Sequence, residues 1–321
     1  MILETTLDDL CVRLSSAHQA EQLNHFSGID AIVLNDSSSD CSFDHLPQCP
    51  VIFTTEQKDV NPVVDVVVAN GTELAQVIKG IEQSPIASQV LVQLLRHNEQ
   101  TNVEQALFAE SLAYSSLQHS DRFRNWLAEH QLRARPLLRD EPPILIDRNA
   151  NELLLVLNRP EKRNAWSVEL RDALSESLHL LDEDKSITSV KLSANGPAFG
   201  AGGDLDEFGL ARDAGEAHLS RAIRNPGRLV YKYRDKISVH LHGACVGAGI
   251  EIPAFARRLL AKPDTFFLLP EVAFGLIPGA GGTVSILKRI GRQRLACMAI
   301  GGQRMNTERA LKWGLIDEIV K

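Results

Sequence analysis

The sequence predicts an α/β protein in which a smaller N-terminal α/β unit ending in helices precedes a larger unit of repeated strand, glycine-loop and helix segments. Three observations support this prediction. The succession of a β-branched strand, a glycine-rich loop and a helix occurs twice in the second half of the chain. The first half alternates helix and strand patterns without such loops, and the linker-like segment 133–143, with three prolines and five charges, separates the halves. We therefore predict two domains, 1–138 and 139–321.

The N-terminal unit shows a regular exchange of helical and strand periodicity. We expect helices over 5–23, 73–95 (interrupted near Pro85), 103–117 and 122–132, strands at 29–34, 51–54 and 63–68, and a loop at 35–40. No catalytic motif lies in this unit, so a packing or oligomerisation role is expected for it.

The second unit begins with two short strands, 144–146 and 152–157, around a turn. Ser167 can cap a helix whose apolar positions form one stripe, and a strand at 190–192 leads into the loop FGAGGDL. A strand at 237–241 leads into HGACVGAGIE, and we expect the following helix to carry Ala254, Phe255 and Leu259. Pro253 suits a first helical turn, which places the helix start within a few residues before it.

Two glutamates beside glycine turns are the strongest chemical signal. Glu251 ends HGACVGAGIE, and Glu271 follows the first residue of PEVAFGLIPGAGGT. A carboxylate can give or take a proton, and a glycine turn can present bare backbone N–H groups to a ligand oxygen. The combination predicts an enzyme that stabilises a negative oxygen while moving protons beside it.

Residues 144–321 resemble the crotonase (enoyl-CoA hydratase/isomerase) superfamily. The resemblance rests on five motifs in order: LNRPEKRNA, PAFGAGGDL, HGACVGAGIE, LPEVAFGLIPGAGGT and GGQRMNTERALKWGLIDEIV. It implies a ββα spiral superhelix and an acyl-CoA thioester substrate. The AESLAYSSLQ run before the linker resembles the extra domain of some longer relatives.

The resemblance also implies roles for particular residues. Glu251 would activate water and Glu271 would protonate the alpha carbon, which favours enoyl-CoA hydration. The backbone N–H groups of Ala201 and Ala248 would bind the thioester oxygen. Residues expected to contact or shape the coenzyme A site are Lys162, Arg163, Ala165, Gly200, Gly202, Gly203 and Asp204, the last of which can also hold its own loop through backbone N–H bonds. An enoyl-CoA isomerase or another enolate-forming enzyme would need only the oxyanion site and Glu271, and a non-catalytic CoA-thioester-binding protein is the third alternative.

Composition limits the partners. The formal net charge is −7 and the pI about 5.8, so neither nucleic acid nor an anionic membrane is expected to bind. Five scattered cysteines favour reduced thiols, and the acidic start lacks signal-peptide features, so a cytoplasmic protein is expected. His240 and His242 are expected to be hydrogen-bonded strand residues, and no metal or cofactor beyond substrate coenzyme A is predicted. The resemblance implies a homo-oligomer, a trimer or hexamer.

The end of the chain departs from the family pattern. Relatives continue beyond a segment like GLIDEIV into helices that cover the acyl pocket, whereas this sequence stops at Lys321. The nearest source of apolar cover is 103–132, which is rich in leucine and aromatic residues. We therefore expect this helical run to pack on the catalytic unit and help to close the pocket.

Overall fold

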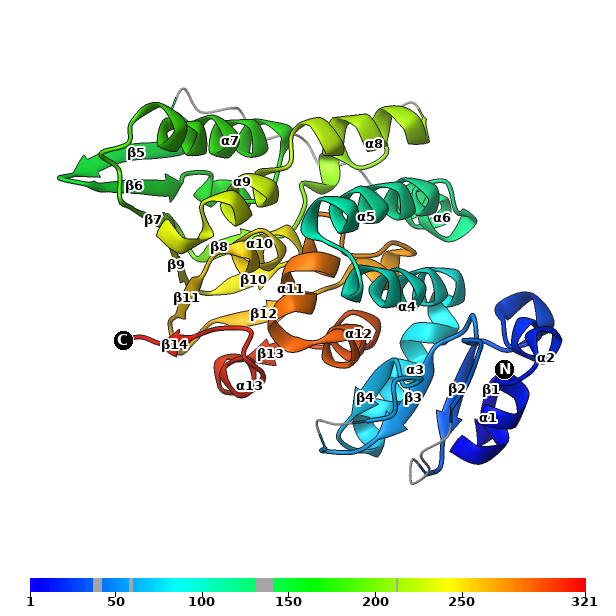
Figure 1. Cartoon of the computed structure of the whole chain (residues 1–321). Coiled ribbons are helices and arrows are strands. Elements are labelled where there is room, and N and C mark those ends of the chain that lie inside the picture. The colour runs from blue at the N-terminus through cyan, green and yellow to red at the C-terminus, as the bar shows by residue number, and fades with distance from the viewer. Residues whose placement is uncertain (37–41, 58–59, 131–140, 212) are drawn as a thin grey trace.

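Three β-sheets organise the chain (Figure 1). The structure is a computed structural model and describes residues 1–36, 42–57, 60–130, 141–211 and 213–321. One four-stranded sheet is N-terminal, and a six-stranded sheet and a second four-stranded sheet belong to the rest of the chain. The predicted domain boundary at 138/139 falls outside the described residues.

The N-terminal sheet is parallel throughout. Its order is β1 (Ile2–Thr5), β2 (Ala31–Leu34), β3 (Val51–Thr54) and β4 (Val66–Val68). The first two strands are connected through α1 (Leu7–Leu14), α2 (Ala17–Glu21) and the short 3₁₀ helix η1 (His25–Ser27). Thr6 caps α1, because its hydroxyl accepts the Asp9 N–H. The apolar side of α1 then packs on one face of the sheet.

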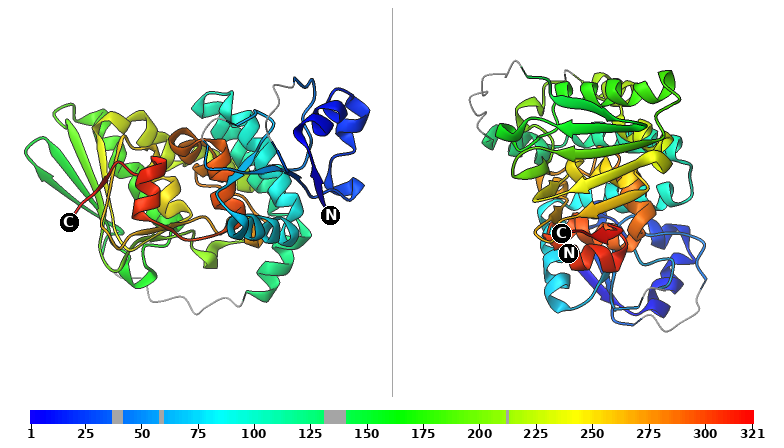
Figure 2. Two further views of the ribbon diagram at one scale, coloured as in Figure 1. Left: turned by 90° about the horizontal axis from the view of Figure 1, so that it is seen from below. Right: turned by 90° about the vertical axis from the view of Figure 1, so that its left-hand side faces the viewer.

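Four helices follow this sheet: α3 (Gly71–Gln83), α4 (Pro85–Glu99), α5 (Val103–Leu117) and α6 (Asp121–Glu129). Local sequence fixes their starts. Asn70, Asn102 and Ser120 each accept a backbone N–H at the N-cap of α3, α5 and α6, and Pro85 occupies the first turn of α4. In the left view of Figure 2, α4 to α6 lie between the N-terminal strands and the strands at the other end of the molecule.

The six-stranded sheet has the order β14 (Glu318–Ile319), β11 (Arg258–Ala261), β9 (Ile237–Leu241), β7 (Ser189–Ala194), β6 (Glu152–Leu157) and β5 (Ile144–Asn149). Only β5 and β6 pair in antiparallel fashion; the other neighbours are parallel. Side chains along β6 and β9 alternate between buried and half-buried, so one face of this sheet contacts the core.

The second four-stranded sheet contains β13 (Met305–Asn306), β12 (Phe266–Leu268), β10 (Ala244–Val246) and β8 (Ala198–Ala201), in that order. The chain passes from the large sheet to this one three times, from β7 to β8, from β9 to β10 and from β11 to β12. A helical segment follows each passage, which generates successive ββα units. The glycine loops of the sequence lie at these passages and at the helix starts that follow them.

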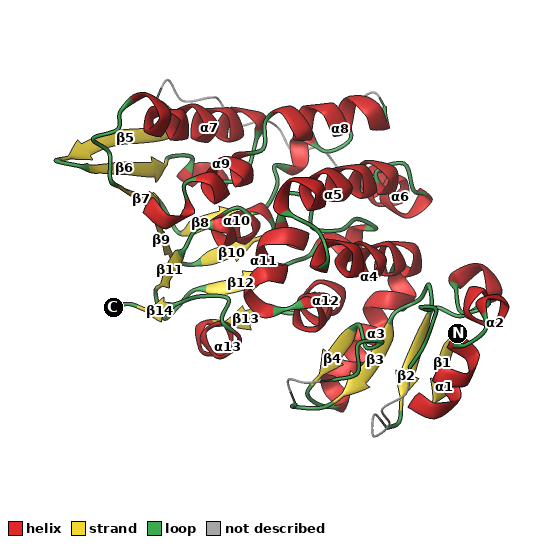
Figure 3. Ribbon diagram, viewed as in Figure 1, coloured by secondary structure: helices red, strands yellow, loops and turns green. Residues whose placement is uncertain are grey.

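The remaining helices cover the two sheets, as the colouring of Figure 3 shows. They are α7 (Val168–Glu183), α8 (Ala214–Ile223), α9 (Pro226–Lys232), α10 (Ala248–Glu251), α11 (Gly282–Ile290), α12 (Arg292–Gly301) and α13 (Thr307–Trp313), with 3₁₀ helices η2 (Pro160–Lys162), η3 (Leu205–Glu207), η4 (Arg234–Lys236), η5 (Pro253–Phe255) and η6 (Glu271–Phe274). Ser167 caps α7 as predicted, accepting the Leu170 N–H.

The main hydrophobic core is continuous across the linker. One buried cluster includes Val66 of the N-terminal sheet, Leu95 and Leu107 of the helices, and Leu155 and Ile286 of the second half. A smaller cluster lies beneath α1 on the other face of the N-terminal sheet. The N-terminal helices and the second half therefore share one core.

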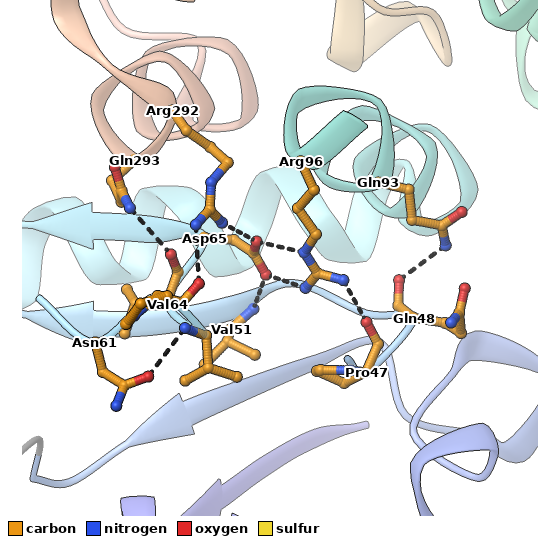
Figure 4. Close-up of polar contacts among 12 residues, drawn as sticks. Pro47, Gln48, Val51, Asn61, Val64, Asp65, Gln93, Arg96, Arg292 and Gln293 are labelled. Atoms are coloured by element: carbon orange, nitrogen blue, oxygen red, sulfur yellow. Dashed lines mark hydrogen bonds and ion pairs between the residues drawn. The ribbon is translucent and has the colours of Figure 1, made fainter. Parts of the chain in front are cut away.

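A buried ionic cluster also joins the two halves (Figure 4). Asp65, which is fully buried, binds Arg96 of α4 through Nε at 2.8 Å and Arg292 of α12 through Nη1 at 2.6 Å. The same carboxylate accepts the Val51 N–H at 3.0 Å. Arg292 additionally donates to the Pro62 carbonyl and to Glu99. A carboxylate without solvent is tolerated here because donors from three elements surround it.

We expect Asp65→Asn to lower the free energy of unfolding by about 3 kcal/mol, because two buried guanidinium groups lose their shared anion. Denaturant titration monitored by circular dichroism would measure this change. Asp235→Asn is the matched control, since Asp235 pairs with Arg257 at the surface and both side chains are largely exposed. Equal stability losses in the two variants would contradict the role assigned to the cluster.

Most predicted elements are confirmed, with three corrections. The helix expected over 5–23 is divided into two short helices, α1 and α2, and the strand β1 before them was not predicted. The expected strand 63–68 contains only 66–68 as strand. Leu259 lies in β11 and not in the helix with Ala254, because Pro253 limits that helix to α10 and the short η5.

The cysteines are only partly as expected. Cys49, Cys245 and Cys297 are buried free thiols, whereas Cys11 is in a disulfide, so the expectation of reduced thiols is wrong for Cys11. Cysteine spacing alone does not reveal which chain segments the fold brings together. Within the described residues, no helix has the length and apolarity needed to span a bilayer.

Candidate active site

A pocket lies where α5, α8 and α9 meet α10 and the segment that follows Glu271. The residues that line it include the two glutamates Glu251 and Glu271, the backbone at Gly203 and Ala248, and the aromatic side chains of Tyr114 and Trp166. Figure 1 shows α5 beside α8 and α10 beside α11 around this region. Thus the structure brings the two predicted glutamates to one cavity, together with residues of the N-terminal helices.

Glu251 is the last residue of α10 and is only 2% exposed. Its Oε2 accepts the N–H groups of Ala280 at 2.8 Å and Gly282 at 2.9 Å. A side chain at Gly282 would lie 2.7 Å from the Cγ of Glu251, so the close approach of this turn requires glycine. The carboxylate is therefore held by backbone donors at the start of α11, and its Oε1 remains for other partners.

Glu271 begins η6, and its carboxyl group lies next to Gly247, which precedes α10. A Cβ added to Gly247 would lie 2.5 Å from Glu271 Oε1 and 3.7 Å from Glu251 Oε1, so both carboxyl groups approach this one glycine. Gly247 also has a φ of +48°, which other residues rarely adopt. The Oε2 of Glu271 is buried and has no hydrogen-bond partner among the described residues.

The surroundings of the two carboxyl groups differ, and this difference gives the two groups different pKa values. Burial raises the pKa of Glu251, but the two backbone N–H bonds favour its ionised form. Burial and then the negative charge of Glu251 raise the pKa of Glu271 well above its ordinary value. Glu271 is therefore the member of the pair that keeps a proton near neutral pH, and Glu251 is the member that loses it first.

Ala201 does not supply the first oxyanion donor. Its N–H donates to the carbonyl of Arg163 at 3.0 Å, so the prediction for Ala201 is wrong. Gly203, two residues further on, lines the pocket, and among the described residues its N–H has no acceptor. Two backbone hydrogen bonds to Trp166 hold the residues on either side of Gly203. The Trp166 N–H donates to the Gly202 carbonyl, and the Asp204 N–H donates to the Trp166 carbonyl.

Ala248 lies where it was predicted, at the first residue of α10 and on the pocket wall. The N–H of a first helical residue has no partner within its helix, and within the described structure that of Ala248 meets no other acceptor. The backbones next to Gly203 and Ala248 pack closely against each other. A Cβ at Gly249 would lie only 2.3 Å from the Gly200 carbonyl oxygen, so this contact requires glycine. Gly200 thus serves close packing between β8 and α10.

The residues predicted to contact coenzyme A lie near one another but have varied surroundings. Lys162 Nζ binds Asp204 at 2.6 Å, and Asp204 also accepts the Asp206 N–H at 3.1 Å, so Asp204 holds its own loop as expected. Arg163 is exposed, with a φ of +51°. Of the other predicted members, Ala165 is half-buried and Gly202 has a φ of +97°. Gly203 lines the pocket and Gly200 packs against α10.

The N-terminal helices pack on the second half within the same chain, as expected. A Cβ at Gly279 would lie 2.2 Å from the ring of Tyr114 on α5, and one at Gly209 would lie 2.4 Å from Leu127 on α6. Trp126 of α6 stacks on Phe274 with 4.5 Å between ring centroids. Gln118 of α5 also lines the pocket.

Sequence reasoning did not single out three residues that lie near Glu251 and Glu271. Glu110 and Tyr114 come from α5, and Arg221 of α8 lies over the Tyr114 ring at 4.6 Å from its centroid. The sequence did contain a pattern that could have identified Glu110. Glu110, Tyr114 and Gln118 are spaced by four residues, so they share one face of a helical run that is otherwise rich in alanine and leucine. His242 hydrogen-bonds with the Gly196 carbonyl at 2.9 Å, and His240 lies half-buried on β9.

Successive ββα units with glycine loops at their passages define a crotonase-like spiral, preceded here by a smaller α/β region that ends in helices. A solved enoyl-CoA hydratase from Thermoplasma volcanium supports this fold: it superimposes with a TM-score of 0.52 at 29% identity and covers 56% of this chain and 72% of that one. The family model for enoyl-CoA hydratase/isomerase matches residues 147–321. The chain therefore belongs to the enoyl-CoA hydratase/isomerase family.

Curated relatives carry both kinds of activity in their names. A 2,3-dehydroadipyl-CoA hydratase of Escherichia coli K12 is 28% identical over 55% of this chain and 68% of its own length. A trans-2-decenoyl-acyl-carrier-protein isomerase of Streptococcus mutans is 27% identical over 51% of this chain and 64% of its own length. The similarity thus spans about half of this chain and about two thirds of these relatives, and it supports an enzyme of the hydratase/isomerase kind.

Proposed function

We propose that the protein is an enoyl-CoA hydratase, which adds water across the 2,3 double bond of an acyl-CoA thioester. One observation carries this proposal: two buried carboxyl groups with different pKa values converge on Gly247. On the same pocket wall lie the N–H groups of Gly203 and Ala248, which meet no acceptor in the described part of the chain. The relative named as a 2,3-dehydroadipyl-CoA hydratase agrees with it.

In the proposed reaction, the N–H groups of Gly203 and Ala248 bind the thioester oxygen and stabilise the enolate that forms on it. Ionised Glu251 removes a proton from water as the water oxygen bonds to C3 of the substrate. Glu271, which holds a proton, gives it to C2, and the enolate returns to the thioester. The proton taken by Glu251 must then pass to Glu271 to restore the starting state.

An enoyl-CoA isomerase is the second candidate. It would use Glu271 alone to move a proton between two carbons. The Oε2 of this residue, which has no hydrogen-bond partner among the residues that the structure describes, suits such a role. A relative named as an isomerase agrees with this alternative. The firm fixation of Glu251 beside Glu271 favours hydration, because an isomerase does not require a second carboxylate.

The test is an assay of the purified full-length protein with a panel of acyl-CoA esters. We expect loss of the ultraviolet absorbance of crotonyl-CoA as its conjugated double bond is hydrated. Conversion of a 3-enoyl-CoA to the 2-enoyl ester without hydration would instead establish the isomerase. Binding of acyl-CoA without turnover of any ester would contradict both activities and indicate a binding protein.

A further inference from the structure

The turn at 280–283, where α11 begins, is held by two carboxyl groups that bind alternate backbone N–H groups. Glu251 accepts those of Ala280 and Gly282. Glu110 accepts those of Gly281 at 2.7 Å and Thr283 at 3.0 Å, and also the Thr283 hydroxyl at 2.6 Å. Four successive N–H groups at this helix start are therefore bonded, each to one of two glutamates.

Glu110 comes from a different part of the chain than Glu251. It lies on α5, outside the family-matched segment 147–321, and is 2% exposed. One turn later on α5, Tyr114 packs against Gly279 next to the same turn and lines the pocket. The N-terminal helices thus do more than cover the pocket, because one of them bonds directly to the turn that holds a catalytic carboxylate.

We propose that Glu110 is a positioning residue of the active site: by holding the N–H groups of Gly281 and Thr283, it fixes the turn from which Ala280 and Gly282 fix Glu251. This inference rests on the proposed function for its catalytic consequence. A displaced turn would release or reorient the Glu251 carboxylate, and small displacements of a catalytic group cost a large part of its effect.

The charge of Glu110 also affects the pKa of Glu271, and this effect can be measured separately from the positioning of the turn. The titratable and charged groups that face this cluster are Glu251 of α10, Glu271 of η6, Tyr114 of α5 itself and Arg221 of α8. Burial and the negative charge of Glu251 raise the pKa of Glu110 to about 8. Above that pH the negative charge of Glu110 is one of the causes that raise the pKa of Glu271, after burial and Glu251. Removing the Glu110 charge should therefore lower the pKa of Glu271.

The primary variant is Glu110→Gln, which keeps the size of the side chain and removes the charge and one acceptor. We expect kcat to fall about 10- to 100-fold, with KM changed less than about threefold, since Glu110 is not among the residues that line the pocket. The rate requires protonated Glu271 and is lost as pH rises through its pKa. The alkaline limb of the pH–rate profile should therefore move to lower pH by about 0.5 to 1 unit.

Two further variants separate the causes. Glu110→Asp keeps the charge but is too short to bond Gly281 and Thr283 together, so kcat should fall while the alkaline limb stays in place. Glu104→Gln makes the same chemical change on the same helix at an exposed position paired with Arg228, and it should behave like the wild type in both measurements.

Amide hydrogen exchange of the segment 279–284, read by mass spectrometry, tests the positioning role without catalysis. We expect faster exchange there in Glu110→Gln and Glu110→Asp than in the wild type and Glu104→Gln.

If the wild type hydrates no enoyl-CoA, the proposed function fails and this measurement still decides the inference. If Glu110→Gln does not fold, Glu110→Asp decides it by the same kcat and exchange readouts. Wild-type kcat together with wild-type exchange in a folded Glu110 variant would overturn the proposal.

Discussion

Glu251→Gln and Glu271→Gln should each lower the rate of crotonyl-CoA hydration by about 100-fold or more, because positioned acid–base groups supply about 10²- to 10⁴-fold. The amide oxygen at residue 251 can still accept both backbone N–H groups, as Oε2 of Glu251 does, but the amide cannot take a proton from water. At residue 271 the amide has the size of the protonated carboxyl group but gives no proton to carbon. Initial rates followed by ultraviolet absorbance measure both effects.

The two variants should differ in one informative respect. If Glu271 alone moves protons, as in the isomerase alternative, Glu271→Gln abolishes turnover of a 3-enoyl-CoA whereas Glu251→Gln leaves it largely intact. The exposed Glu308 provides the control substitution Glu308→Gln, for which the rate should stay at the wild-type value. Hydration at a near-normal rate in either active-site variant would remove that glutamate from the mechanism.

Ala248→Pro should lower kcat by about 10²- to 10³-fold, the loss typical for removal of one oxyanion donor. Proline lacks the N–H that we propose binds the thioester oxygen. The substitution is otherwise mild, because Ala248 is the first residue of α10, where proline is well tolerated, and the preceding Gly247 has no Cβ to clash with the proline ring.

Ala248→Ser is the matched variant, since it adds a polar atom at the same place but keeps the N–H. We expect it to retain most of the wild-type kcat, and both proteins should show similar thermal unfolding. Equal activity of the proline and serine variants would mean that the Ala248 N–H does not stabilise the enolate, and the donor would have to be sought elsewhere on the pocket wall.

The sequence by itself determined the features that depend on neighbouring residues. The bounds of β3, β9 and α5 follow from β-branched runs and helical spacing, and the start of α7 follows from the cap at Ser167. The ordered glycine motifs around Glu251 and Glu271 indicated the family and singled out two carboxyl groups that the fold brings to one pocket, because the turns that shape this pocket need glycine locally at positions such as Gly247.

Only the tertiary structure decided which groups meet across long separations in the chain. Ala201 and Gly203 share one glycine motif, and they differ because the carbonyl of Arg163 approaches the N–H of Ala201. Glu110 reaches Gly281 across 171 positions, and Asp65 reaches Arg292 across 227. Periodicity identifies the face of a helix or strand that is buried, but it contains no information about the distant partner that the buried face meets. The unbonded N–H of Gly203 among the described residues therefore follows only from the folded second half, and the contacts of Glu110 and Asp65 follow only from the packing of the N-terminal elements on that half.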